Sequence, residues 1–334
     1  MPLTHIPSTK TRHADRALTR FGFLALLTAA FLTACSKKPA DADALTVGFA
    51  QIGAESGWRT ANTKSIRSEA EARGINLKFT DAQGKPENQL RAVRTFIQQR
   101  VDVIAFPASV ATGWDAVLED AKKAGIPVVF TDRKATVADE SLYACFIGAD
   151  FVEEGRQAAR WLVEATGGNA RIAELEGSPG SDPAIDRAKG FREVIAEHPG
   201  MTIIKSQSGD FSMAKGKEVA ESFLRSPEGP QITAFYAHND EMALGAAMAI
   251  KAAGRKPGTE ILIVSVDGQK NAMEAILAGE LNCTIECNPM IGPLLFDVAR
   301  RLHNGETVDR WVKTEARVFD ASNLTPELVA ARAY

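Results

Sequence analysis

The chain has 334 residues, of which 45% are hydrophobic and 24% are charged, and its formal net charge is −3. This composition excludes disordered, collagen-like and coiled-coil proteins, and the length is enough for two domains or one large α/β domain. The small net charge argues against a nucleic-acid partner, and five scattered histidines with four cysteines leave little material for a metal cluster.

The first 34 residues have the pattern of an export signal. Four basic residues lie between positions 10 and 20, and the apolar run that follows at 21–31 is too short for a membrane span. The sequence Leu32-Thr33-Ala34-Cys35 resembles the lipobox of bacterial lipoproteins, in which the cysteine is lipidated and becomes the new N-terminus. We therefore expect a signal peptide at 1–34 and a lipidated polar tether at 35–44. The alternative is a soluble export signal in which Cys35 is incidental.

From Leu45 onward, short apolar strands alternate with amphipathic helices. The first series of predicted strands is 45–52, 75–80, 101–106, 126–131 and 142–148, with helices at 58–73, 86–99 and 113–124. After residue 149 the pattern restarts, with helices at 151–166, 183–197, 213–225, 240–253 and 270–278 and strands at 171–177, 201–207, 232–237 and 261–267. The end of the chain adds a strand-like segment at 281–287, a helix at 290–304 and a strand at 311–319. This alternation predicts an α/β protein with two doubly wound parallel-sheet domains.

The cysteines do not indicate a disulfide framework. Cys283 and Cys287 lie on one predicted strand, so at about 3.3 Å per residue they are about 13 Å apart. A disulfide needs Cα atoms within about 7 Å of each other, so these two residues cannot pair. We expect free thiols.

Polar and aromatic residues follow several predicted strands, and no enzyme motif accompanies them. The segment Glu55-Ser56-Gly57-Trp58-Arg59 follows the first strand, Asp132-Arg133 follows the fourth, and Asp267 ends a strand of the second series. The carboxyl ends of parallel strands are where open α/β sheets bind ligands. An indole can cover the apolar face of a sugar ring, and neighbouring charged groups suit its hydroxyls. For Asn239, a helix N-cap is the ordinary role.

The order of these segments resembles the ribose/galactose group of type I periplasmic sugar-binding proteins of bacterial ABC importers. The resemblance extends from Leu45 to about Phe319 and is greatest for galactofuranose-binding members. It rests on DR at 132–133, RxxGF at 187–191, SGDFxxxKG at 208–216, NDEMALGA at 239–246 and VDG at 266–268.

The resemblance implies a clamp of two domains joined by three hinge crossings, near 148–151, 286–289 and 316–320. The N-terminal domain would comprise 45–148 and 289–317, and the C-terminal domain 149–288 and 318–334. The implied ligand-binding residues are Glu55, Ser56, Gly57, Trp58, Arg59, Asp132, Arg133, Arg187, Phe211, Asn239 and Asp267. Cys287 departs from ribose-binding relatives, which have a glutamine there, and so weakens the case for ribose.

The implied function is a receptor that binds a monosaccharide, galactofuranose or a related pentose or hexose, and delivers it to ABC permease subunits. We expect no enzymatic activity, no cofactor, no metal and no nucleic-acid partner. We expect the protein to be a monomer located in the periplasm or on the outer face of the membrane. A sugar receptor feeding a sensor kinase or chemoreceptor is the alternative. A regulator of the LacI type would need an N-terminal helix-turn-helix, which residues 1–44 do not provide. A glycosidase using Asp132 and Asp267 is disfavoured, because Arg133 favours the ionised form of Asp132.

Overall fold

The structure is a computed structural model, and it describes residues 45–334. The predicted signal peptide at 1–34 and the predicted tether at 35–44, with Cys35, lie outside the described residues. Within 45–334, no helix is both long and apolar enough to cross a membrane.

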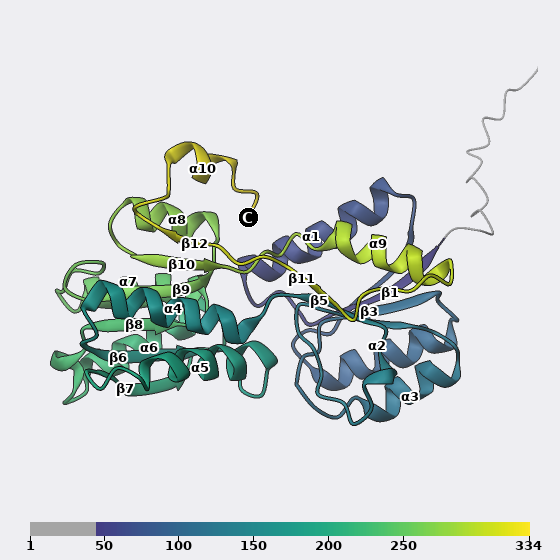
Figure 1. The fold of residues 1–334 in the computed structure, drawn as a ribbon, viewed down its shortest axis with the longest axis horizontal. Coiled ribbons are helices and arrows are strands. Elements are labelled where there is room, and N and C mark those ends of the chain that lie inside the picture. The colour runs from purple at the N-terminus through teal and green to yellow at the C-terminus, as the bar shows by residue number, and fades with distance from the viewer. Residues whose placement is uncertain (1–44) are drawn as a thin grey trace, which may run out of the picture. The chain divides into compact units, whose positions relative to one another are not determined.

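The first sheet contains the early strands and one strand from near the end of the chain (Figure 1). Its strands are β1 (Thr46–Gln51), β2 (Asn76–Asp81), β3 (Val103–Phe106), β4 (Val128–Thr131), β5 (Cys145–Gly148) and β11 (Trp311–Lys313). The strand order is β11-β5-β4-β3-β1-β2, and every neighbouring pair is parallel. One face packs against α1 (Gly57–Ala72) and α9 (Gly292–His303), and the other against α2 (Pro86–Gln98) and α3 (Asp115–Lys123). A 3₁₀ turn, η1 (Glu140–Leu142), precedes β5.

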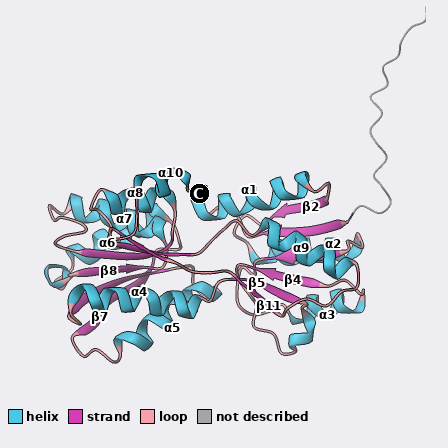
Figure 2. Cartoon of the chain, turned by 45° about the horizontal axis from the view of Figure 1, so that its top comes forward, coloured by secondary structure: helices cyan, strands magenta, loops and turns pink. Residues whose placement is uncertain are grey.

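The second sheet repeats this architecture with the middle of the chain (Figure 2). Its strands are β6 (Ala170–Glu176), β7 (Met201–Ser208), β8 (Ala234–Ala237), β9 (Leu262–Asp267), β10 (Cys283–Glu286) and β12 (Val318–Asp320), in the order β12-β10-β9-β8-β6-β7. One face packs against α4 (Phe151–Thr166) and α5 (Asp182–Ile195), and the other against α6 (Met213–Arg225), α7 (Asp240–Ala252) and α8 (Lys270–Leu277). A 3₁₀ turn, η2 (Gly229–Gln231), precedes β8, and α10 (Pro326–Ala331) follows β12.

The predicted α/β fold class is confirmed, and its physical basis is the burial of the strands. All residues of β3, β4, β5, β8 and β10 are buried, as expected for parallel strands covered on both faces. The one exception to parallel pairing is β12, which runs antiparallel to β10.

The predicted strand at 311–319 is wrong, because two strands occupy this segment and belong to different sheets. β11 pairs with β5, whereas β12 pairs with β10. The connection, residues 314–317, bonds to both sheets: the Thr314 N–H donates to the Gly148 carbonyl, and the Arg317 carbonyl accepts from the Glu286 N–H. The chain thus passes between the sheets three times, after β5, after β10 and after β11. The predicted strand at 142–148 is also shorter, since η1 ends at Leu142 and β5 begins at Cys145.

Two glycines let α4 and α5 pack with their backbones in contact. A Cβ atom on Gly190 would overlap the carbonyl of Val152, and one on Gly155 would overlap the carbonyl of Arg187. Any larger residue would push the two helices apart. This close packing sets the position of Arg187, which α5 carries into the site described next.

Candidate functional site

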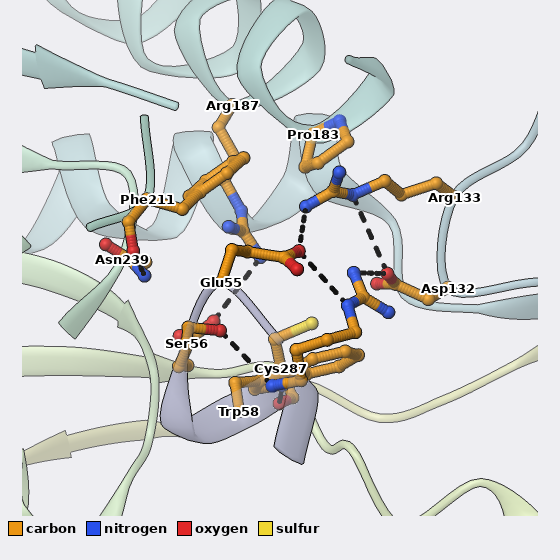
Figure 3. A pocket seen from close by; sticks show the side chains of 12 residues that line it. Glu55, Ser56, Trp58, Asp132, Arg133, Pro183, Arg187, Phe211, Asn239 and Cys287 are labelled. Carbon is orange, nitrogen blue, oxygen red and sulfur yellow. Dashed lines mark hydrogen bonds and ion pairs between the residues drawn. The ribbon is translucent and has the colours of Figure 1, made fainter. Parts of the chain in front are cut away.

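A small cavity with about 20 Å³ of free space lies where the carboxyl ends of strands from both sheets come together (Figure 3). Its walls are formed by Glu55, Ser56, Trp58, Arg59, Asp132, Arg133, Pro183, Arg187, Phe211, Asn239, Asp267 and Cys287. All of the predicted ligand residues except Gly57 are in this set. This free space is enough for about one water molecule.

The loop after β1 places one carboxylate between two guanidinium groups. The Glu55 Oε1 atom accepts from Arg59 Nε and from Arg133 Nη2, both at 3.2 Å (Figure 3). Ser56 caps α1, since its hydroxyl accepts from the Arg59 N–H, and this fixes the start of the helix. Burial raises the pKa of Glu55, but Arg59 and Arg133 outweigh it and hold the pKa below its ordinary value, so the carboxylate is ionised at neutral pH.

Asp132 joins this group from the end of β4. Its Oδ2 accepts from Arg59 Nη2 at 2.6 Å, and the Arg59 side chain is 2% exposed. Burial alone lowers the pKa of a guanidinium, but Asp132 and Glu55 raise the pKa of Arg59 above its ordinary value. Asp132 has a φ of 59°, in the left-handed region that aspartate tolerates better than most residues. The chain therefore turns sharply after β4 and directs the side chain back toward α1.

Two guanidinium nitrogens at this wall have unused hydrogen-bonding capacity. Arg59 Nη1 and Arg133 Nε are buried and have no hydrogen-bond partner within residues 45–334. The Asp132 Oδ2 atom is 3.7 Å from Arg133 Nε, which is too far for a hydrogen bond. A buried donor without a partner costs about 1–3 kcal/mol, so both N–H groups favour an oxygen ligand in the cavity.

Arg187 is the corresponding cation on the side of the second sheet. Its Nε donates to Glu154 Oε2 at 2.8 Å, its Nη1 donates to the His238 carbonyl at 2.7 Å, and its Nη2 is 3.9 Å from Asp267 Oδ1. The side chain is 4% exposed, so the surface position usual for a helical arginine does not apply. Its ion-pair partner comes from α4 and not from its own helix.

Sequence reasoning missed Glu154, which lies behind Arg187 and is fully buried. Burial raises the pKa of Glu154, and the charge of Arg187 only partly offsets this. The single available signal was an acidic pair, Glu153-Glu154, at the start of a predicted helix, and such pairs are usually solvated N-terminal turns. Sequence reasoning also did not place Pro183 in the site, although it is four residues before Arg187 and so shares its helix face.

Asp267 and Asn239 complete the wall formed by the second sheet. Asp267 ends β9, and its Oδ2 accepts from Gln269 Nε2 at 3.2 Å. Burial raises the pKa of Asp267 well above its ordinary value, although Arg187 lowers it. Asn239 caps α7 as predicted, with its Oδ1 accepting from the Met242 N–H, while its Nδ2 donates to the Phe211 carbonyl. One side chain thus starts a helix and holds the loop that carries an aromatic ring.

The two aromatic rings of the cavity come from opposite sheets. The Trp58 Nε1 donates to the Cys287 carbonyl, which ties α1 to the segment after β10, and the Arg59 guanidinium lies 4.7 Å from the indole centre. The Phe211 ring has the Arg133 guanidinium at 5.1 Å and rests on Gly177, where no side chain would fit. Cys287 is buried and free, as are Cys145 and Cys283, in agreement with the predicted thiols.

Gly57, which the resemblance implies as a ligand residue, is not among the residues that line the cavity. It is exposed on the first turn of α1, and its N–H donates to Glu241 Oε1 at 3.1 Å.

The chemistry of the site is that of polar recognition. His238 is buried with its ring between Glu174 and the Gly177 N–H, and burial lowers its pKa, so it is a neutral structural group. No cluster of three or more His, Cys, Asp or Glu side chains suited to a metal ion occurs in the part of the chain that the structure describes. The guanidinium groups can donate to hydroxyl oxygens, the carboxylates can accept hydroxyl protons, and the two rings offer apolar faces.

The family profile described as periplasmic binding protein domain matches residues 47–307. The galactofuranose-binding protein YtfQ of Escherichia coli (strain K12) is 45% identical over 306 residues, which cover 91% of this chain and 96% of that protein.

Solved structures of sugar-bound proteins are also similar to the chain. A protein from Mycobacterium smegmatis in complex with β-D-fucofuranose is 53% identical, with a TM-score of 0.81, and the match covers 84% of this chain and 92% of that one. The binding component of the arabinose ABC transporter of Shewanella sp. ANA-3, bound to α- and β-L-arabinofuranose, is 49% identical with a TM-score of 0.81, covering 86% and 93%. On the profile match, the identity and the shared fold, the chain belongs to the periplasmic binding protein family.

Proposed function

We propose that the chain binds a monosaccharide in its furanose form in this cavity and delivers it to the membrane-spanning subunits of an ABC importer. The observation that carries the proposal is that Arg59 and Arg133, which both line the cavity, each have one buried guanidinium nitrogen without a hydrogen-bond partner among residues 45–334. Three relatives add support: one is a galactofuranose-binding protein, and the other two were solved with fucofuranose and with arabinofuranose bound.

The proposed mechanism is a hinge closure of two lobes. The first lobe comprises 45–148 and 289–317, and the second lobe comprises 149–288 and 318–334. Each lobe would contribute one half of the cavity, with Asp132 and its neighbours on the first and Arg187 and Asp267 on the second. A ligand that contacts both halves has a higher affinity for the closed arrangement and shifts the population toward it.

The proposed ligand residues divide the recognition of the sugar among three kinds of contact. Arg59, Arg133 and Arg187 donate to ring and hydroxyl oxygens, and the carboxylates of Glu55, Asp132 and Asp267 accept from hydroxyls. Trp58 and Phe211 cover the apolar C–H faces, while Ser56 and Asn239 complete the lining. Charge-assisted hydrogen bonds contribute about 1.5–3 kcal/mol each, so the stereochemistry of each hydroxyl matters.

The lining also orders the candidate sugars. Cys287 presents a thiol where an amide would offer a paired donor and acceptor, and the first loop carries one bulky aromatic ring and two charges. We rank galactofuranose first, other pentoses and hexoses second, and ribose below both.

A thermal-shift screen of the mature protein with galactose, arabinose and ribose tests the binding proposal. A sugar that binds only the folded state at one hundred times its dissociation constant raises the stability by about 2.7 kcal/mol. A competition titration then orders the sugars, with the furanose fraction followed by NMR. Tightest binding of ribose, or selection of the pyranose form of galactose, would overturn the ranking. Release of aryl alcohol from an aryl glycoside would instead point to an enzyme.

We further propose that the protein is exported, monomeric, and anchored by lipid on Cys35 after removal of residues 1–34. The lipobox-like sequence supports the anchor, and the family supports the export. Mass spectrometry of natively expressed protein should find a lipidated Cys35, and an unmodified N-terminus near Leu45 would contradict the anchor.

The alternative to transport is a receptor that reports to a sensor kinase or chemoreceptor through the same cavity. Cells lacking the gene would then take up the sugar normally but lose the response to it.

A further inference from the structure

Gly57 lies at the rim of the cleft, where the first turn of α1 meets the start of α7. Its N–H donates to the Glu241 carboxylate at 3.1 Å, a bond between residues 184 positions apart. We propose that Gly57 and Glu241 form a latch between the lobes, and that Gly57 is a positioning residue that sets sugar affinity without touching the sugar. This inference rests on the proposed sugar-binding function.

The electrostatic part of the latch follows from the sequence of α1. The first turn of a helix has N–H groups without partners in the helix and a partial positive charge. The first turn of α1 contains no acidic residue of its own, and its cap, Ser56, is uncharged. Glu241, half-buried in the first turn of α7, supplies the missing carboxylate from the other lobe. The contact therefore stabilises the arrangement in which the lobes meet.

The steric part of the latch depends on the absence of a side chain at position 57. A Cβ atom on Gly57 would lie 2.7 Å from Gln269 Oε1 and 2.9 Å from Glu241 Oε1. Gln269 cannot move freely, because its side chain is buried, its Nε2 donates to Asp267 and its backbone N–H donates to Asp240. Glu241 is half-buried and can turn away, so a methyl group at position 57 acts mainly through Gln269: it would displace the side chain that holds Asp267 or separate the lobes.

The backbone conformation of Gly57 allows an alanine to affect the contact between the lobes without affecting the folding of the first lobe. Its φ is outside the left-handed region, and it is the first residue of α1, where alanine is sterically allowed and has the higher helix propensity. An alanine here should not harm the folding of the first lobe. The glycine is required only where the second lobe approaches.

Two other contacts between the lobes have the same chemistry. The Ala111 N–H donates to the Gly180 carbonyl at 3.0 Å, and the Lys134 N–H donates to Asp182 Oδ2 at 3.2 Å. In all three contacts a backbone N–H of the first lobe meets an oxygen of the second. The Gly57 contact differs because it adjoins Gln269 and, through it, a wall of the cavity.

The test is a titration of the full mature chain with L-arabinose and D-galactose, using Gly57→Ala, Glu241→Ala and the double variant. For Gly57→Ala we expect the dissociation constant to rise about tenfold or more. The added methyl group overpacks the contact and destabilises the closed arrangement, and the loss of affinity should appear mainly as faster release of the sugar. Its melting temperature without sugar should equal or exceed that of the parent. Glu241→Ala should weaken binding less, and in its background Gly57→Ala should cost less, since one obstructing oxygen is gone. Thr60→Ala, exposed in the same helical turn, is the matched control and should bind like the parent.

Small-angle X-ray scattering gives a second readout that separates this inference from the proposed function. Gly57→Ala should have a larger mean radius of gyration than the parent, because closed molecules are disfavoured. A parent that binds neither sugar while Gly57→Ala still expands would defeat the proposed function and support the latch. Unchanged affinity together with an unchanged radius of gyration in Gly57→Ala would overturn the latch.

Discussion

Replacing Asp132 by asparagine isolates the charge of one proposed ligand residue. Asparagine keeps the shape of the side chain and, like aspartate, tolerates the φ of 59° at this position, whereas alanine would add backbone strain. The change removes the anionic acceptor of the Arg59 Nη2 bond at 2.6 Å. Arg59 keeps its second partner, Glu55, at 3.2 Å, so the guanidinium is not left without a counter-charge.

The size of the effect follows from the burial of this pair. The side chains of Arg59 and Asp132 are 2% and 6% exposed, so solvent screens their charges little. A hydrogen bond to a charged group contributes about 1.5–3 kcal/mol, and each 1.4 kcal/mol is a factor of ten in affinity. If Asp132 accepts a sugar hydroxyl, Asp132→Asn should raise the dissociation constant about 10- to 150-fold.

Isothermal titration calorimetry with L-arabinose and D-galactose measures this change, and circular dichroism checks the fold. Asp210→Asn is the matched control, because Asp210 has a φ of 56° and is exposed. We expect the control to bind like the parent. A folded Asp132→Asn protein with the affinity of the parent would show that this carboxylate does not bind the sugar.

Two further predictions concern stability. Gly190→Ala should lower the free energy of unfolding by about 1–3 kcal/mol or more, because its Cβ would overlap the Val152 carbonyl. Chemical denaturation measures this change. An unchanged denaturation midpoint would contradict the close packing of α4 and α5. Burial, then the charge of Asp186, raises the pKa of Asp182 from 3.8 to about 6, so the folded state binds this proton more tightly than the unfolded chain. Stability should therefore fall as pH rises from about 4 to about 6. Asp182→Asn should flatten this slope and raise the melting temperature at pH 7 more than at pH 4, and equal slopes would refute the assignment.

The sequence alone determined the fold class and most of the cavity lining. Continuous apolar strands between amphipathic helices are specific to covered parallel sheets, because only such sheets bury both strand faces. The carboxyl ends of the strands bring Glu55 and Asp132 to one edge of the first sheet, and Asp267 to the corresponding edge of the second sheet. The helix cap at Asn239 was predictable because capping is local: the Asn239 side chain accepts from the N–H three residues later.

Only the tertiary structure decided which distant groups meet. The partner of Arg187 is Glu154, from another helix, and nothing in the spacing along α5 indicates it. The segment 311–319 is uniformly strand-like, and its division between two sheets depends on the edges that β5 and β10 leave open. The contact of Gly57 with Glu241, and the lack of room for a side chain at position 57, are visible only in the structure. Local patterns record periodicity and capping, whereas pairings across the cleft depend on the packing of whole sheets and helices.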